Sequence, residues 1–157
     1  MTIALQFVQA SGIGSQAIEL FEHGWCSHVD CVMPDGRLLG ARSDVIGGAT
    51  AAGVQIRTPN YEPVSRTQRV TLLMTDDQEK KFYAFLNEQL GKPYDTTAIV
   101  AFAMNRNWRE NDSWFCSELM AAAIEASGWF IRPLSNGVNK ITPSDLLLVL
   151  SPWNLEK

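Results

Sequence analysis

The sequence predicts an α+β fold in which an antiparallel sheet packs on helices, and three observations support this prediction. Residues 26–33 and 37–41 alternate on either side of the turn Pro34-Asp35-Gly36, a pattern typical of a β-hairpin. Thr75 and Thr142 each stand where a side chain would cap a helix. Expected strands dominate the first half of the chain and expected helices the second, and this segregation is typical of α+β domains.

The bulk composition predicts one domain, residues 1–157, with a single hydrophobic core. Apolar residues make up 46% of the chain and charged residues 19%, which is ordinary for a globular protein. The net charge is −4 and no run of Lys or Arg occurs, so the composition argues against nucleic acid and against a polybasic membrane patch. The composition does not address the oligomeric state.

The hydropathy pattern argues against an integral membrane segment. No apolar run reaches the roughly 18–20 residues that a helix needs to cross a bilayer. Residues 1–7 carry neither a basic region nor a long apolar stretch, so we expect no signal peptide. A cytoplasmic location is therefore the default expectation, although export by other routes leaves no pattern in the sequence.

The remaining strands are expected in and around an irregular region. Ser15 is suited to cap a short helix that reaches Phe21. Residues 44–68 are rich in Gly, Ala, Thr and Pro, so we expect a long loop with one short strand inside it. The expected strands outside the hairpin are residues 3–9, 54–57 and 70–74.

The first long helix has clear start and stop signals. Thr75 and Gln78 match a capping box, in which each residue bonds the backbone of the other. Gly91 and Pro93 end the helix. Its apolar residues fall at helical spacing: Phe82, Phe85, Leu86 and Leu90.

Three more helices are expected towards the C-terminus. The first starts at Thr96 or Thr97 and reaches Ala103, and a polar loop follows from 105 to 112. Ser113 is expected to cap the second, which contains Cys116 and stops at Ser127-Gly128. The third begins with Thr142 as cap and Pro143 in its first turn, and covers residues 144–150.

Cys116 is the candidate nucleophile because of its position in the first turn of an expected helix. Backbone N–H groups and the helix dipole stabilise a thiolate there. The same N–H groups can donate to an oxyanion during acyl transfer. Trp114 and Phe115 precede it, as walls of a substrate pocket or as core residues. Taken alone, Cys116 also fits simple core packing.

His28 is the candidate general base, since a thiol nucleophile and its base are usually distant in sequence and close in the fold. Side chains alternate along a strand, so Cys26, His28 and Asp30 share one face. A catalytic imidazole needs an acceptor on its second nitrogen. Across the hairpin Ser43 lies opposite His28, a longer loop would bring Asp44 there, and Asp30 is a third candidate.

The cysteine and histidine residues near the hairpin could also form a metal site. The three cysteines, an odd number, predict reduced thiols rather than a disulfide framework. The residue types of His23, Cys26, His28 and Cys31 suit zinc. Cys31 projects from the opposite side of the strand, however, so four ligands in nine extended residues do not easily surround one ion. We therefore expect no metal.

Three segments between residues 27 and 119 carry a family resemblance. They are the pair Ser27-His28-Val29 and Pro34-Asp35-Gly36, the run Gly91-Lys92-Pro93-Tyr94-Asp95, and the run Trp114-Phe115-Cys116-Ser117-Glu118-Leu119. These resemble the histidine strand pair, the G-x-P-Y segment and the F-C-S-E-L nucleophile helix of the NlpC-like superfamily of papain-fold cysteine peptidases and amidases. The resemblance is greatest to its circularly permuted, YiiX-like branch.

The resemblance implies a permuted papain-like domain with Cys116 as nucleophile, His28 as base and Tyr94 lining the oxyanion site. It implies no metal or organic cofactor. Members of this branch cleave peptide or amide bonds in cell-wall material, and others act on lipid acyl groups. One departure stands out, since the family often carries a polar residue where Gly40 stands here.

The leading interpretation is therefore a cysteine hydrolase that cleaves an amide bond of a peptide or of peptidoglycan. A lipid acyl hydrolase or acyltransferase of the same fold is one alternative, and an apolar pocket for an acyl chain would favour it. A non-catalytic binding or structural module with a decayed site is the other. Gly40 favours the decayed site, while Cys116 and His28 argue against it.

Overall fold

The computed structural model describes residues 1–10, 24–45, 51–61, 63–95, 113–134 and 141–156. Within these ranges the chain forms five strands, three α-helices and one 3-10 turn. The strands are β1 (Thr2–Ala10), β2 (His28–Val32), β3 (Leu38–Arg42), β4 (Gly53–Arg57) and β5 (Val64–Leu73). The helices are α2 (Asp76–Glu88), α4 (Cys116–Ser127) and α5 (Pro143–Leu150), followed by η2 (Ser151–Trp153).

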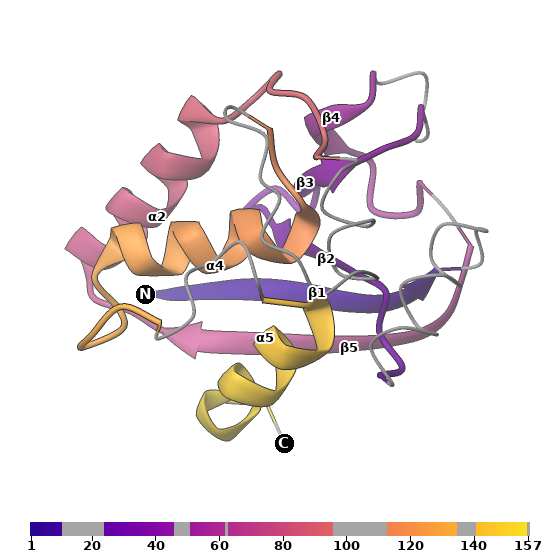
Figure 1. Ribbon diagram of the computed structural model, residues 1–157. Coiled ribbons are helices and arrows are strands. Elements are labelled where there is room, and N and C mark those ends of the chain that lie inside the picture. The colour runs from indigo at the N-terminus through magenta and orange to yellow at the C-terminus, as the bar shows by residue number, and fades with distance from the viewer. Residues whose placement is uncertain (11–23, 46–50, 62, 96–112, 135–140, 157) are drawn as a thin grey trace.

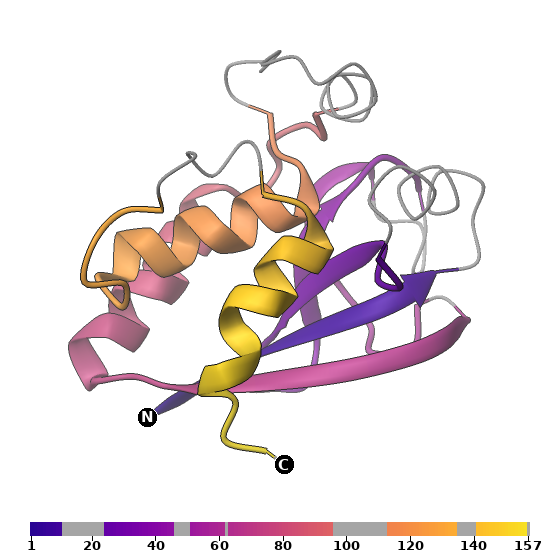
Figure 2. The same cartoon turned by 60° about the horizontal axis from the view of Figure 1, so that its bottom comes forward.

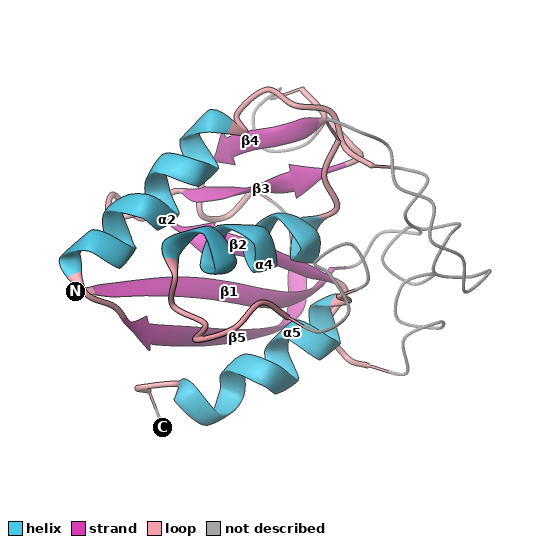
Figure 3. Cartoon of the chain, turned by 60° about the vertical axis from the view of Figure 1, so that its left-hand side comes forward, coloured by secondary structure: helices cyan, strands magenta, loops and turns pink. Residues whose placement is uncertain are grey.

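The strands form one antiparallel sheet in the order β4-β3-β2-β1-β5 (Figure 1). The three described helices lie together on one face of this sheet (Figures 2 and 3). Alternation therefore buries one side of each central strand beneath the helices. The side chains so buried include Ile3, Leu5 and Phe7 of β1, and Val29 and Cys31 of β2.

Helix α4 is the central helix of this layer. It packs against α2, α5, β2 and β3, and its residues are buried over nearly its whole length. It ends at Gly128, whose φ of 74° is the left-handed conformation that favours glycine at the end of a helix. Its first residue, Cys116, is thereby fixed close to β2 and β3.

The two outer helices begin at side-chain caps. Thr75 and Gln78 form the capping box of α2, with Thr75 N to Gln78 Oε1 at 3.0 Å. Thr142 and Asp145 form that of α5, in which Pro143 occupies the first turn. These caps satisfy backbone N–H groups that have no partner inside a helix.

The chain after α5 is fastened to the edge of the sheet. Asn154 Oδ1 accepts a hydrogen bond from the backbone N–H of Thr71 at 2.8 Å. The N–H of Leu155 donates to the carbonyl oxygen of Thr71 at 3.0 Å. The C-terminal end of the described chain therefore lies beside β5, and the N-terminal end lies at the start of β1, the strand that pairs with β5 on its other side (Figure 1).

The structure confirms the α+β fold class, with an antiparallel sheet packed on helices, and the hairpin of β2 and β3. It also confirms the helix starts at Thr75 and Thr142. The expected short helix from Ser15 lies outside the described residues, as do the helix expected to reach Ala103 and the polar loop 105–112.

Two element boundaries differ from expectation. Strand β5 begins at Val64, within the region expected to be loop, and pairs with β1 along its whole length. Ser113 does not cap α4, because the N-cap position belongs to Phe115. Two backbone hydrogen bonds of 3.0 Å hold Trp114 in an extended conformation beside residues 93–95. The N–H of Trp114 donates to the carbonyl oxygen of Pro93, and the N–H of Asp95 donates to the carbonyl oxygen of Trp114. The helix therefore starts only at Cys116.

Candidate active site

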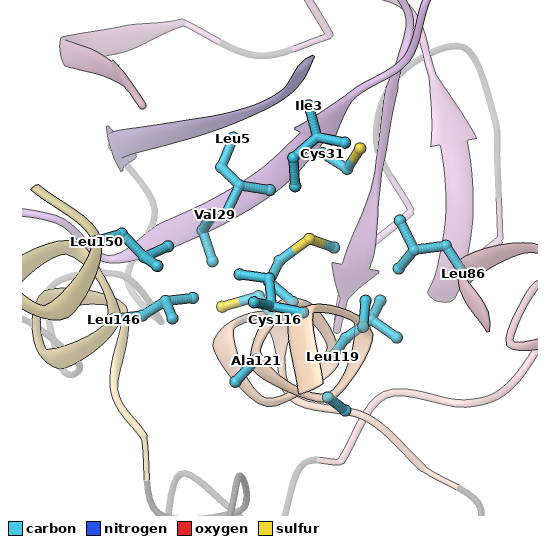
Figure 4. Close-up of a cluster of buried hydrophobic side chains, with 14 of the residues drawn as sticks. Ile3, Leu5, Val29, Cys31, Leu86, Cys116, Leu119, Ala121, Leu146 and Leu150 are labelled. Atoms are coloured by element: carbon cyan, nitrogen blue, oxygen red, sulfur yellow. The ribbon is translucent and has the colours of Figure 1, made fainter. Parts of the chain in front are cut away.

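Cys116 is the first residue of α4 and is only 1% exposed. The preceding Phe115 has extended backbone, and its N–H donates to Glu118 Oε2 at 3.4 Å. Figure 4 shows Cys116 within a cluster of buried side chains that includes Val29 of β2 and Leu146 of α5. The sulfur thus combines a buried environment with the N-terminal end of a helix, where N–H groups favour negative charge.

His28 is the first residue of β2 and lies beside Cys116, despite their separation in sequence. The Cys116 side chain is a hydrogen-bond partner of His28, and the imidazole is 6% exposed. Its Nε2 atom lies 2.8 Å from Asp30 Oδ1. Because Asp30 engages Nε2, Nδ1 is the ring nitrogen available to the thiol. The histidine therefore stands between a thiol and a carboxylate.

Asp30 is the one of the three proposed acceptors that bonds His28. Its carboxylate is buried, and its second oxygen, Oδ2, accepts a hydrogen bond from the Tyr61 hydroxyl at 2.7 Å. Ser43 is exposed. The Asp44 carboxylate instead accepts hydrogen bonds from Arg42 at 2.7 and 2.9 Å.

The hairpin register explains why Ser43 is not opposite His28. Cys31 pairs with Leu39 and Val32 with Leu38. Continued along the antiparallel strands, this register brings Gly40 opposite Asp30, and Arg42 rather than Ser43 opposite His28. The expected pairing was therefore wrong by one residue, which would turn the partner side chain to the other face of the sheet.

Gly40 provides the space in which the Asp30 carboxylate lies. A Cβ atom at position 40 would overlap Asp30 Oδ1 and would lie 2.9 Å from Asp30 Cγ. No folded protein tolerates such an approach without movement of one of the two groups. The absence of a side chain at Gly40 thus leaves room for the Asp30 carboxylate from the neighbouring strand, which contacts His28.

The charges of His28 and Asp30 stabilise each other. Burial alone would lower the pKa of His28, but the charge and hydrogen bond of Asp30, with a smaller contribution from Cys116, raise it to about 10. Burial would likewise raise the pKa of Asp30, but the charge of His28 and the hydrogen bonds from His28 and Tyr61 lower it. His28 is therefore a strong base held next to an ionised carboxylate.

Two arginines surround the Asp30–Tyr61 pair, and sequence reasoning did not identify them or Tyr61. Arg42 donates to the Tyr61 hydroxyl at 3.2 Å, and its guanidinium lies 5.2 Å from the centre of the Tyr61 ring. Arg57 is 2% exposed and donates to Gly40 O at 3.0 Å and Gly53 O at 3.2 Å. Tyr61 lies in the stretch expected to be loop, where no periodicity marks a residue as buried or bonded.

The three remaining site candidates lie at different places. Tyr94 packs its ring 5.8 Å from that of Phe115, and burial, followed by the nearby Cys116 group, raises the pKa of its phenol. Phe115 is itself 1% exposed. Trp114 instead faces α2, where its Nε1 donates to Gln89 Oε1 at 3.1 Å. The structure thus brings Tyr94 and Phe115 near Cys116 and turns the Trp114 indole towards α2.

The residues weighed for zinc have different partners. Cys26 Sγ lies 3.5 Å from Ser144 Oγ of α5. Cys31 contacts the Tyr83 hydroxyl of α2, while His28 contacts Asp30 and Cys116. His23 lies outside the described residues. In the described part of the chain, no group of three or more His, Cys, Asp or Glu side chains could hold a metal ion.

Comparisons with known proteins find a similar fold among solved structures. No protein-family model matches the chain, and no curated protein matches it. Among solved structures, the metalloprotein yiiX from Escherichia coli O157:H7 is similar, with a TM-score of 0.58 and 19% sequence identity over 83% of this chain and 67% of that one. At this identity the likeness shows a YiiX-like fold. Among the described residues, no helix is long and apolar enough to span a bilayer.

Proposed function

We propose that this protein is a cysteine hydrolase that cleaves an amide bond, of the peptide or peptidoglycan type, through a thioester. The observation that carries the proposal is the position of His28, with Asp30 on Nε2 and the Cys116 side chain as a further partner. A nucleophile, a base and an orienting acceptor in contact are the arrangement that activates a thiol.

In the first step the Cys116 sulfur attacks the carbonyl carbon of the substrate. His28, which a pKa of about 10 keeps as an imidazolium at neutral pH, holds the proton that leaves the thiol, and the ionised Asp30 stabilises this imidazolium through the 2.8 Å contact. The carbonyl oxygen becomes an oxyanion, for which the N–H groups at the start of α4 are donors. The Tyr94 hydroxyl is a further donor candidate, because this side chain is close enough to Cys116 for their charges to interact.

In the second step the tetrahedral intermediate collapses and the carbon–nitrogen bond breaks. The His28 imidazolium gives its proton to the departing amine, which leaves the acyl group on Cys116 as a thioester. His28 then deprotonates a water molecule, whose oxygen attacks the thioester carbonyl. Release of the carboxylic acid returns the proton to the cysteine, so no cofactor, oxidant or reductant is consumed.

The amide class rests on the resemblance to the NlpC-like superfamily, with the YiiX-like fold as support. The competing lipid class would need an apolar pocket that leads to Cys116. The described residues do form an apolar cleft with Trp129 and Trp153, but it lies beyond the C-terminal end of α4, whereas Cys116 is at the N-terminal end. That cleft does not favour lipid acyl transfer.

Thiol labelling tests the proposal without a known substrate. Cys26, Cys31 and Cys116 are all at most 1% exposed, so burial alone predicts similar rates. We expect iodoacetamide to alkylate Cys116 faster than the other two near neutral pH, as measured by peptide mass spectrometry. The advantage should disappear in His28→Ala. Equal, slow labelling of all three thiols in the wild-type protein would contradict the mechanism.

Turnover is tested with purified peptidoglycan fragments and a mixed peptide library, with products detected by mass spectrometry. Cys116→Ala should abolish cleavage and cost little stability, because it deletes a single small side chain. Cys116→Ser is the matched control, since it keeps the shape and replaces the thiol by a poorer nucleophile. Full cleavage by Cys116→Ala would exclude Cys116 as the nucleophile.

A further inference from the structure

A cleft of about 780 Å³ lies at the end of the molecule opposite to Cys116. Its walls include Leu73, Trp129, Ile131, Arg132, Trp153 and Leu155. These residues come from the tip of β5, the segment after α4 and the chain after α5, which lie side by side in Figure 1. The twelve residues of α4 separate the cleft from Cys116 by roughly 18 Å, so the two sites are distinct.

The aromatic walls are fixed by contacts within the protein. Trp129 Nε1 donates to the carbonyl oxygen of Leu73 at 2.9 Å. The Trp129 ring packs edge-to-face on Trp153, with centroids 5.6 Å apart. The two bonds of residues 154 and 155 to Thr71 hold the segment that carries Trp153. A ligand would therefore meet a prearranged surface, which reduces the entropic cost of binding.

The apolar side chains of this cleft face water. Ile131 is 99% exposed, Leu73 62% and Trp153 61%. Apolar groups grouped in this way and held apart by a rigid backbone are typical of binding sites rather than of ordinary surface. The volume also lies within the range of about 300–1,000 Å³ that is usual for small-molecule sites.

Arg132 supplies the only charge among the described residues that line the cleft. Its guanidinium makes no ion pair or hydrogen bond with the part of the chain that the structure describes. A cation at the edge of an apolar surface favours one negatively charged group on the ligand.

We propose that this cleft binds a single-chain anionic amphiphile, with its alkyl tail against Trp129 and Trp153 and its carboxylate at Arg132. The tail would cover apolar surface that is now in water, and the carboxylate would pair with the guanidinium. This site goes beyond the proposed hydrolase and does not depend on it, because none of the cleft residues contacts His28, Asp30 or Cys116 among the described interactions.

The test is calorimetric titration of the intact protein with three probes that carry a twelve-carbon chain, the two ionic ones below their critical micelle concentrations and dodecanol below its solubility limit. We expect laurate to bind, and dodecanol and dodecyltrimethylammonium to bind more weakly or not at all. Arg132→Gln should weaken laurate binding about fivefold, the effect of losing one exposed charge pair, and leave dodecanol unchanged. Equal affinity for laurate and dodecanol, or no binding of laurate, would overturn the proposal.

Three controls locate the binding site. Ile131→Ser should weaken laurate binding, whereas Leu148→Ser should not, because Leu148 is 74% exposed on α5 and does not line the cleft. Equal loss in both variants would indicate nonspecific adsorption. Cys116→Ala should bind laurate with wild-type affinity. Weaker laurate binding by this variant would mean that the amphiphile binds next to the Cys116 thiol and not in the cleft. If the protein sediments with phosphatidylglycerol vesicles but does not bind dispersed laurate, the cleft binds a membrane surface and not a single amphiphile, and the proposal is wrong.

Discussion

At the scale of single residues, the candidate site depends on a glycine in β3 that leaves room for a carboxylate in β2. The alternation of β2 already placed His28 and Asp30 on one face, so the sequence could offer Asp30 as a partner. It could not choose Asp30 over Ser43 or Asp44, because that choice depends on the hairpin register and on the absence of a side chain at Gly40. Gly40, interpreted from the sequence as the loss of a polar residue, leaves the space that the Asp30 carboxylate occupies.

Gly40→Ala tests this relation directly. The added methyl group would overlap the Asp30 carboxylate and displace it from His28. We expect the alkylation rate of Cys116 and the rate of cleavage to fall by about tenfold or more, as expected when a catalytic imidazole loses its orienting partner. The rates are compared with those of the wild-type protein and of Asp30→Ala.

The double variant Asp30→Ala/Gly40→Ala separates this effect from general damage. Once the carboxylate is removed, the methyl group at position 40 has room, so the double variant should be no slower than Asp30→Ala alone. Additive losses of the two substitutions would mean that Gly40 acts through something other than Asp30.

At the scale of elements, local signals located helix starts well and an edge strand poorly. The Thr75 and Thr142 caps depend only on residues within one turn, so they can be read from sequence. The first half of β5 is mostly exposed and lacks an apolar alternation, since β5 is an edge strand and its pairing with β1 defines it. Likewise, the start of α4 at Cys116 is fixed by the bridge between Tyr94 and Trp114, which is a tertiary contact.

Thr75→Ala should lower stability without affecting the candidate site. The substitution removes the hydroxyl that accepts from Gln78 N at 3.2 Å. Loss of such a cap costs about 1 kcal/mol, which lowers Tm by about 2–4 °C in a chain of this size. Thr58→Ala is the control, because Thr58 is exposed and caps none of the described helices. Calorimetry that finds equal Tm values for the two variants would contradict the role of the cap.

At the scale of the whole molecule, α4 connects two regions of opposite character. Its first residue, Cys116, is buried and contacts the His28 imidazole, which pairs with the Asp30 carboxylate. Its last turn leads to an open apolar cleft. The apolar periodicity of the sequence predicted the layer of helices over the sheet, because burial of apolar surface is what forms such layers. It could not predict Tyr61, Arg42 and Arg57 around Asp30, because buried polar contacts between distant segments leave no periodic pattern.

The buried His28–Asp30 pair should make the free energy of unfolding decrease as the pH becomes alkaline. The pKa of His28 rises from 6.5 to about 10 on folding, so its stabilisation is fully present below pH 6.5 and is lost as the pH rises through 10. We therefore expect the free energy of unfolding, measured in urea, to fall between pH 7 and pH 10. Burial also raises the pKa of Cys31 and of Tyr83, which adds a decline at the upper end of this range.

His28→Gln isolates the contribution of the imidazole, because it keeps a polar side chain that does not titrate and leaves Cys31 and Tyr83 in place. The difference in unfolding free energy between the wild-type protein and this variant should be largest near pH 6 and should shrink towards pH 10. A difference that stays constant over this range would mean that folding leaves the pKa of His28 unchanged. In that case the imidazolium would not be stabilised by Asp30, and the proton transfer from Cys116 would lose its driving force.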